Sequence, residues 1–176
     1  MLALTLLVGG LSSAFAQGTL DFAVDLSGAN EVPTNASPGF GSGTLHLDGT
    51  TLSYVINMSI SFQDGAEPTG VTINGPADTS STAPMLFDLG TPTLITIQPP
   101  PGSYYSSGGT INNLTSTQID DLLAGLWYVN VFTSSGTFPE GEIRGQIVPV
   151  PEPSTWALLA SGGVVVWWNG RQKRKG

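Results

Sequence analysis

The chain has 176 residues, with 23 glycines, 13 prolines and no cysteine, and its net charge is -8 at neutral pH. Residues 17–149 contain twelve carboxylates and one cation, Arg144, and so negative a field excludes nucleic acid as a partner. The lack of cysteine excludes disulfides, thiolate catalysis and zinc held by cysteine.

Residues 1–16 have the pattern of a signal peptide. An apolar stretch is followed by small residues up to Ala14 and Ala16, which predicts cleavage by signal peptidase before Gln17. A buried N-terminal helix is the alternative, and two glycines inside the stretch argue against it. We therefore expect residues 17–149 to form a single exported domain, since that length can bury a core of its own.

Within this domain the dominant hydrophobic period is two. Apolar and polar residues alternate over 20–26, 52–60 and 143–147, which indicates strands with one buried face. Pairs typical of turns separate the strands. These are Asp48-Gly49, Asp64-Gly65, Asn74-Gly75-Pro76 and Gly108-Gly109. The pattern predicts an all-β fold, an antiparallel sandwich or barrel.

His46 is the single histidine of the chain and lies between Leu45 and Leu47 on a predicted strand. Alternation places its imidazole on the solvent side. Copper or zinc sites built from imidazole need several histidines, so one histidine does not predict such a site.

The segment 98–107 contains three prolines and is predicted to be an exposed loop. Tyr104 and Tyr105 lie in it and are candidates for stacking on sugar rings. The alternative is that both side chains pack within the loop.

One helix is predicted after this loop. Thr115 and Gln118 fit a capping box at its start, and Gly125 fits the position just after its end. Three apolar residues share one face of it, namely Ile119, Leu122 and Leu123. We expect the helix to cover one end of the sandwich.

The C-terminal segment 150–176 has three parts: a turn-forming motif, an apolar run over 155–168 and a basic tail over 171–175. The motif is Val150, Pro151, Glu152, Pro153 and Ser154, and the cations are Arg171, Lys173, Arg174 and Lys175. This order resembles the PEP-CTERM sorting signal of bacterial envelope proteins. The resemblance implies recognition and cleavage by an exosortase.

As a helix, the apolar run is about 21 Å long, shorter than a bilayer core of roughly 30 Å. Local thinning of the bilayer compensates for such a difference, so we expect a transmembrane helix over 155–168. The cations after it favour a cytoplasmic C-terminus, with the domain on the outside. The alternatives are an apolar strand with a solvated tail, and a permanent anchor that is never cleaved.

Four blocks within the domain resemble the CHRD (chordin-type) domain of exported proteins. They are Leu26–Pro33, Gly43–Leu45 with Leu52–Tyr54, Asn74–Ala77, and Leu123–Val131 with Pro139–Ile147. The resemblance implies an immunoglobulin-like β-sandwich distantly similar to copper/zinc superoxide dismutase, without a settled activity.

The chain departs from the family pattern where related domains carry histidines. These usually read His-Ile-His before Gly-Pro-Ala and have another histidine on the strand that contains Tyr-Val-Asn. Here the positions hold Thr72, Ile73, Asn74 and Phe132. Dismutase-like redox chemistry is therefore not expected, and no cofactor and no catalytic residue are predicted.

The remaining charged residues permit weaker hypotheses. Asp120, Asp121, Glu140, Glu142 and Glu31 could together offer oxygen ligands to calcium, although their spacing is not that of an EF-hand. The alternative is a solvated helix face for the first two and a turn or cap for Glu31. Arg144 is expected to pair with a carboxylate and to have a structural role.

Together these features predict an exported, non-catalytic protein of the envelope or extracellular matrix. The expected partners are the two processing enzymes, the membrane, and a polysaccharide or surface protein reached by adhesion. The alternatives are a calcium-binding module or carboxylate-dependent metalloenzyme, and a permanently anchored surface protein.

Overall fold

The computed structural model describes residues 19–61, 67–97, 102–134 and 136–151. The strands are β1 (Leu20–Ser27), β2 (Phe40–Asp48), β3 (Thr51–Ser61), β4 (Pro68–Asn74), β5 (Met85–Asp88), β6 (Thr93–Ile97), β7 (Gly102–Ile111), β8 (Tyr128–Thr133) and β9 (Ile143–Pro149). The helices are the 3-10 turn η1 (Gly28–Asn30) and α1 (Ser116–Leu123). The predicted signal peptide, the sorting motif from Glu152 onward, the apolar run and the basic tail lie outside these residues.

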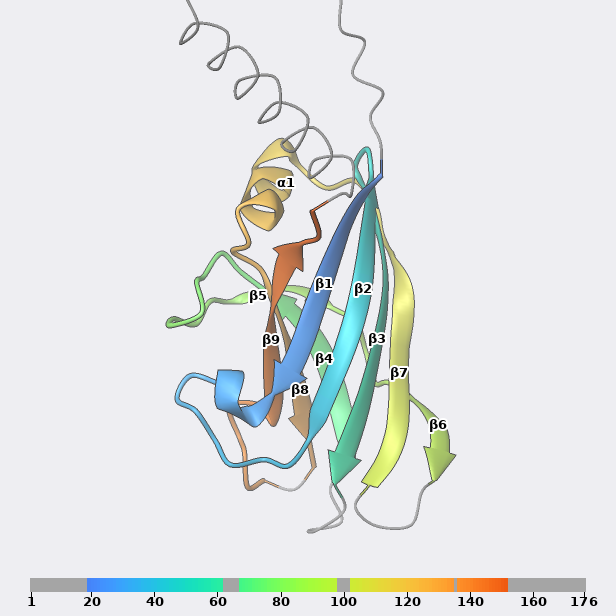
Figure 1. The fold of residues 1–176 in the computed structure, drawn as a ribbon, viewed down its shortest axis with the longest axis vertical. Coiled ribbons are helices and arrows are strands. Elements are labelled where there is room, and N and C mark those ends of the chain that lie inside the picture. Colours follow the sequence, from blue (N-terminus) through green and yellow to red (C-terminus); the bar gives the residue numbers. More distant parts are fainter. Residues whose placement is uncertain (1–18, 62–66, 98–101, 135, 152–176) are drawn as a thin grey trace, which may run out of the picture.

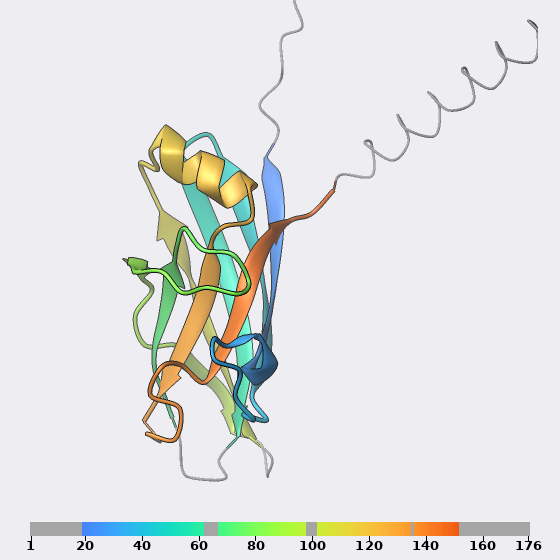
Figure 2. The same ribbon diagram turned by 90° about the vertical axis from the view of Figure 1, so that its left-hand side faces the viewer.

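All nine strands belong to one antiparallel sheet in the order β5-β4-β8-β9-β1-β2-β3-β7-β6. In Figure 1, β4 and β5 lie behind β1, β2 and β3, and the view in Figure 2 shows the same curl from the side. The all-β antiparallel prediction is confirmed. The two layers are parts of one curled sheet with edges at β5 and β6, whereas two separate sheets are the usual form of a sandwich.

The core lies inside the curl and follows the alternation of the sequence. On β3, for example, Leu52, Ile56 and Ile60 are fully buried, while Val55 between them is exposed. Trp127 is the largest buried side chain, and its ring lies 5.6 Å from that of Phe87. Because every central strand contributes inward residues, burial of this apolar surface is the main term that stabilises the fold.

The predicted helix and the first predicted turn are confirmed. The Thr115 hydroxyl accepts a hydrogen bond from the Gln118 backbone, and the Gln118 side chain accepts one from the Thr115 backbone. Gly125 has φ +69°, as expected after the helix end, and Gly49 has φ +58° in the β2–β3 turn. Leu122 is buried, but Leu123 is 41% exposed and does not share its face. Figure 1 shows α1 at one end of the curled sheet.

Two local predictions were wrong. Residues 102–107 belong to β7, so the loop can include only the start of the predicted segment. The pair Gly108-Gly109 lies within β7 and makes no turn. Its role is spatial, because a Cβ at Gly109 would lie 2.7 Å from the Tyr54 hydroxyl oxygen.

Within the part of the chain that the structure describes, no helix is long and apolar enough to cross a membrane. The predicted transmembrane helix over 155–168 falls outside that part.

Candidate functional site

The outer face of β9 carries the buried cation of the domain. Ile143 and Ile147 point into the core, so Arg144 points outward, yet it is only 2% exposed. Its Nη2 donates to the carbonyl oxygens of Asp78, at 2.9 Å, and Ser81, at 2.8 Å. Its guanidinium carbon lies 3.6 Å from the ring centre of Tyr128, a cation–π contact.

Arg144 therefore fastens the segment between β4 and β5 over the sheet. The prediction that Arg144 pairs with a carboxylate was wrong for its hydrogen bonds. The guanidinium donates to two main-chain carbonyl oxygens and lies over an aromatic ring. Burial lowers the pKa of Arg144, and the nearby charges of Tyr128, Glu31 and Asp78 partly offset this. Asp78 itself accepts from the hydroxyls of Ser81 and Ser80, which hold the pKa of its carboxyl below the usual value.

Glu31 follows η1 and is the acidic member of the same site. It is 5% exposed, and burial raises its pKa to about 7, although the Arg144 charge and the Val32 backbone act in the opposite direction. With a pKa near neutrality, the carboxyl is able to donate a hydrogen bond in its protonated form and to accept one in its ionised form.

Asn130, on β8, lies against Glu31 at Gly141. Its Nδ2 donates to the Glu140 carbonyl oxygen at 3.0 Å, which fixes the amide orientation. A Cβ at Gly141 would lie 2.6 Å from Glu31 Oε1 and closer still to Asn130 Oδ1. Gly141 has φ +139°, so glycine is required there both by the backbone and by the space.

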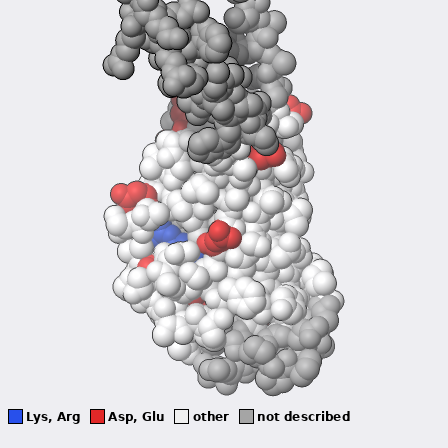
Figure 3. All heavy atoms as spheres, in the orientation of Figure 1, with Lys and Arg blue, Asp and Glu red and all other residues white. Residues whose placement is uncertain are grey.

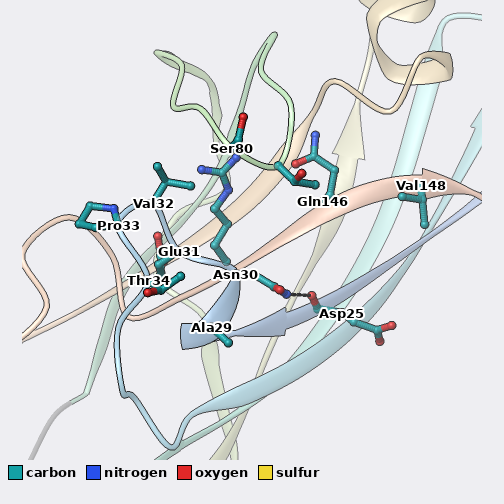
Figure 4. Close-up of a pocket in the computed structure, with 12 residues that line it drawn as sticks. Asp25, Ala29, Asn30, Glu31, Val32, Pro33, Thr34, Ser80, Gln146 and Val148 are labelled. Carbon is teal, nitrogen blue, oxygen red and sulfur yellow. Dashed lines mark hydrogen bonds between the residues drawn. The ribbon is translucent and has the colours of Figure 1, made fainter.

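Two hollows meet at these residues. The larger, about 630 Å³, lies between η1, the following loop, Ser80 and β9, and Figure 4 shows Glu31, Asn30, Asp25 and Gln146 around it. The smaller, about 260 Å³, extends toward Asn130 and Tyr128. Glu31, Val32 and Arg144 line both.

Four buried polar atoms of this site have no protein partner. They are Glu31 Oε1, Asn130 Oδ1, Arg144 Nη1 and Gln146 Oε1. An unsatisfied buried polar group costs about 1–3 kcal/mol, so such groups are normally met by water or by a ligand. Three acceptors and one donor together suit an uncharged polar group that both donates and accepts, as a hydroxyl does.

The positions where related domains usually carry histidine converge on the smaller hollow. Thr72 pairs with Asn130 across β4 and β8, and its hydroxyl donates to Asn74 Oδ1 at 2.6 Å. Asn74 and Phe132 line the hollow. A hydroxyl, an amide and a phenyl ring do not form the imidazole set that copper or zinc needs.

The carboxylates weighed for calcium do not gather. Asp120 and Asp121 lie on α1, which Figure 1 places at the end of the sheet away from η1. Glu142 accepts from Ser37 Oγ at 2.6 Å and from Thr133 Oγ1 at 2.7 Å, so it anchors the loop before β2. Among the described residues no group of three or more His, Asp or Glu could hold a metal ion.

The other singled-out residues lie elsewhere. His46 is exposed as predicted, with Nδ1 2.7 Å from Asp21 Oδ1. Tyr105 points into the core and is 7% exposed, so its candidacy for sugar stacking was wrong. Tyr104, its neighbour on β7, is 44% exposed.

The sequence does not reveal this site as a unit. Asn130 and Gln146 are not predicted as site residues, and Glu31 is predicted only as a calcium ligand or as a turn or cap residue. The available signal was that Glu31 and Arg144, the latter being the one cation of the domain, lie in two of the four blocks that resemble the CHRD domain.

Comparison with known proteins agrees with both resemblances. The CHRD domain model matches residues 22–147, and the PEP-CTERM protein-sorting motif matches residues 149–175. No curated protein and no solved structure matches the chain. Since the first match covers most of the chain, the protein belongs to the CHRD domain family and ends in a PEP-CTERM sorting motif.

Proposed function

We propose that this protein is exported, processed by an exosortase near Pro151, and then acts in the envelope or extracellular matrix by binding polysaccharide, without catalysis. The observation that carries the proposal is the position of the sorting motif directly after the last strand. β9 ends at Pro149 and the motif begins there. The sorting motif marks the chain as exported and envelope-associated.

The end of β9 supports cleavage at this point. The Val150 N–H donates to the Asp21 carbonyl oxygen at 2.8 Å, and this hydrogen bond joins the chain just after β9 to β1. Cleavage after Pro151 would leave the core and the Arg144 site intact. In this proposal residues 155–168 hold the chain in the membrane until cleavage, with the basic tail in the cytoplasm.

Fractionation of the native cells followed by intact mass measurement tests the processing. We expect a species from Gln17 to near Pro151 in the matrix or medium. A full-length tail in the membrane fraction would instead establish a permanent anchor and refute release.

A second function, acid catalysis, is favoured by one observation, the Glu31 carboxyl with a pKa of about 7 in a hollow. Polymer length distinguishes the two functions. We expect the polysaccharide of the host to keep its chain length when incubated with the protein. Shortening that disappears in Glu31→Gln would show catalysis.

A further inference from the structure

The outer face of β1, β2, β3 and β7 is polar and uncharged over most of its area. Alternation places serines, threonines and an asparagine on it, together with the carboxylates of Asp21, Asp25 and Asp48 and a few apolar side chains such as Val55. Most apolar residues of these strands point inward. Figure 3 shows the surface in the orientation of Figure 1 as mostly white, with a small blue area and a few red carboxylates.

A shallow hollow of about 230 Å³ lies on this face between two exposed aromatic residues. Phe40 on β2 is 55% exposed and Tyr104 on β7 is 44% exposed. Both are ladder partners of Ser59 on β3, which lies between them. Ser42 and Asn57 complete the polar lining. Two aromatic side chains on either side of hydroxyl and amide groups form a surface suited to the apolar faces and hydroxyl edges of sugars.

The strand register connects this hollow to the Arg144 site. Asp25 lines the larger hollow of that site, and its ladder partner Ser42 lines the aromatic hollow. One row further along, Arg144 pairs with Ser27, and Ser27 pairs with Phe40. Paired residues of a ladder point to the same face, so the two hollows adjoin on one surface.

The two hollows together extend across the strands from β9 to β7. This distance is four strand spacings, or about 19 Å. Such a length fits several units of an extended polymer. One end offers aromatic stacking, and the other offers Glu31 Oε1, Arg144 Nη1 and Gln146 Oε1, buried polar atoms without a protein partner.

We propose that these two hollows form one binding track for a neutral, hydroxyl-rich polysaccharide, which lies across β9, β1, β2, β3 and β7. The charge of the domain selects the neutral polymer, because twelve carboxylates and one buried cation repel a polyanion. The inference rests on the proposed function, since it identifies where the polysaccharide binds.

Affinity electrophoresis of the full-length chain in mild detergent tests the track. The gels contain hydroxyethyl cellulose, dextran, alginate or the extracellular polysaccharide of the host. We expect a neutral polymer to retard the wild-type chain, and Phe40→Ser with Tyr104→Ser to weaken this binding roughly tenfold. The matched control is Met85→Ser with Leu123→Ser, because these apolar residues, on β5 and α1, are 56% and 41% exposed. Unchanged thermal midpoints establish that all variants fold.

Four results would overturn the track. Equal retardation of the wild type and the aromatic variant would remove it and leave the proposed function standing. Equal losses in the control would show nonspecific apolar adsorption. Alginate binding as tight as that of the neutral polymers would refute the selectivity. A wild-type dimer that the aromatic substitutions dissociate would show that the face joins two copies of the chain.

Two further results distinguish a failure of the track from a failure of the proposed function. No retardation of the wild type by any polymer, the host polysaccharide included, would refute the proposed function together with the track. Oligosaccharides of three and six units, from the polymer that binds, test continuity. Tighter binding of the longer one supports a continuous track, and equal binding would confine the site to the aromatic hollow.

Discussion

The two parts of the curled sheet bury the same kind of inner face and differ in how they use the outer one. Over β4, β8 and β9, a loop segment covers the outward side chains, so Arg144 and Asn130 are buried. We call this the covered part. We call β1, β2, β3 and β7 the open part. Most of its outward side chains are exposed or only half-buried, and Thr44 and Val55 are two exposed examples.

The open part forms its strands with few buried polar side chains on the outer face, so we infer that the buried polar network of the covered part has a role besides forming the sheet. Burying an arginine, a glutamate and an asparagine costs free energy unless each is fully paired. Four polar atoms in the covered part are not paired within the protein. Sites that keep such atoms are candidates for binding.

The largest effect is expected from Arg144→Met. It removes the donor to Asp78 and Ser81 and the cation over Tyr128, so the free energy of unfolding should fall by about 3 kcal/mol. Thr44→Met is the control, because it places the same side chain on the open part. It should change the free energy of unfolding by less than about 0.5 kcal/mol. Urea unfolding measures both. Equal effects would mean that the two parts do not differ in this way.

Gly141→Ala should have the next largest effect. The new Cβ would meet Glu31 and Asn130, and φ +139° disfavours any side chain, so we expect a loss of about 2 kcal/mol. Gly49→Ala is the control, because Gly49 has a positive φ and open space around it. It should cost about 1 kcal/mol. A smaller loss at Gly141 than at Gly49 would show that the contact at Glu31 is loose.

The stability of the covered part should depend on pH through Glu31. The pKa of its carboxyl is about 7 in the folded protein and 4.5 as the ordinary value, so the native state binds more protons between these values. Stability is therefore full below about pH 4.5 and falls as the pH rises through 7. The difference between the two pKa values corresponds to about 3 kcal/mol, and solvent screening at the open hollow reduces this to roughly 2 kcal/mol. The contribution of Asp78 has the opposite sign and lies below pH 4, outside this window.

Thermal midpoints from pH 4.5 to 8 measure this dependence. Glu31→Gln, which is always neutral, should remove the decline and be the more stable form at pH 8. A wild-type midpoint that rises over this range would contradict the assignment.

The sequence predicted what is periodic or local. The alternation over 52–60 placed the core residues of β3, and Thr115 with Gln118 placed the start of α1. It failed at β7, because the prolines at 99–101 and the pair Gly108-Gly109 have the composition of a loop. Gly109 leaves room for the side chain of Tyr54, which lies on another strand.

The site could not be assembled from the sequence for a related reason. Glu31, Asn130 and Arg144 come from three separate segments, and only the register of β8 against β9 and of β9 against β1 brings them together. No spacing within one segment encodes that register. The same holds for Phe40 and Tyr104, which become neighbours only through Ser59 between them.

The smallest effect is expected at the His46–Asp21 contact of the open part. His46 and Asp21 lie on β2 and β1 with half of each side chain exposed, so water and salt screen their attraction. His46→Gln should lower the free energy of unfolding by less than about 0.5 kcal/mol, and 0.5 M salt should reduce that loss further. Asp48→Asn, which changes an exposed carboxylate at the end of β2, is the control. A loss above about 1 kcal/mol at His46, measured by urea unfolding, would show that the open part also depends on its outward contacts. The contrast with the covered part would then be one of degree only.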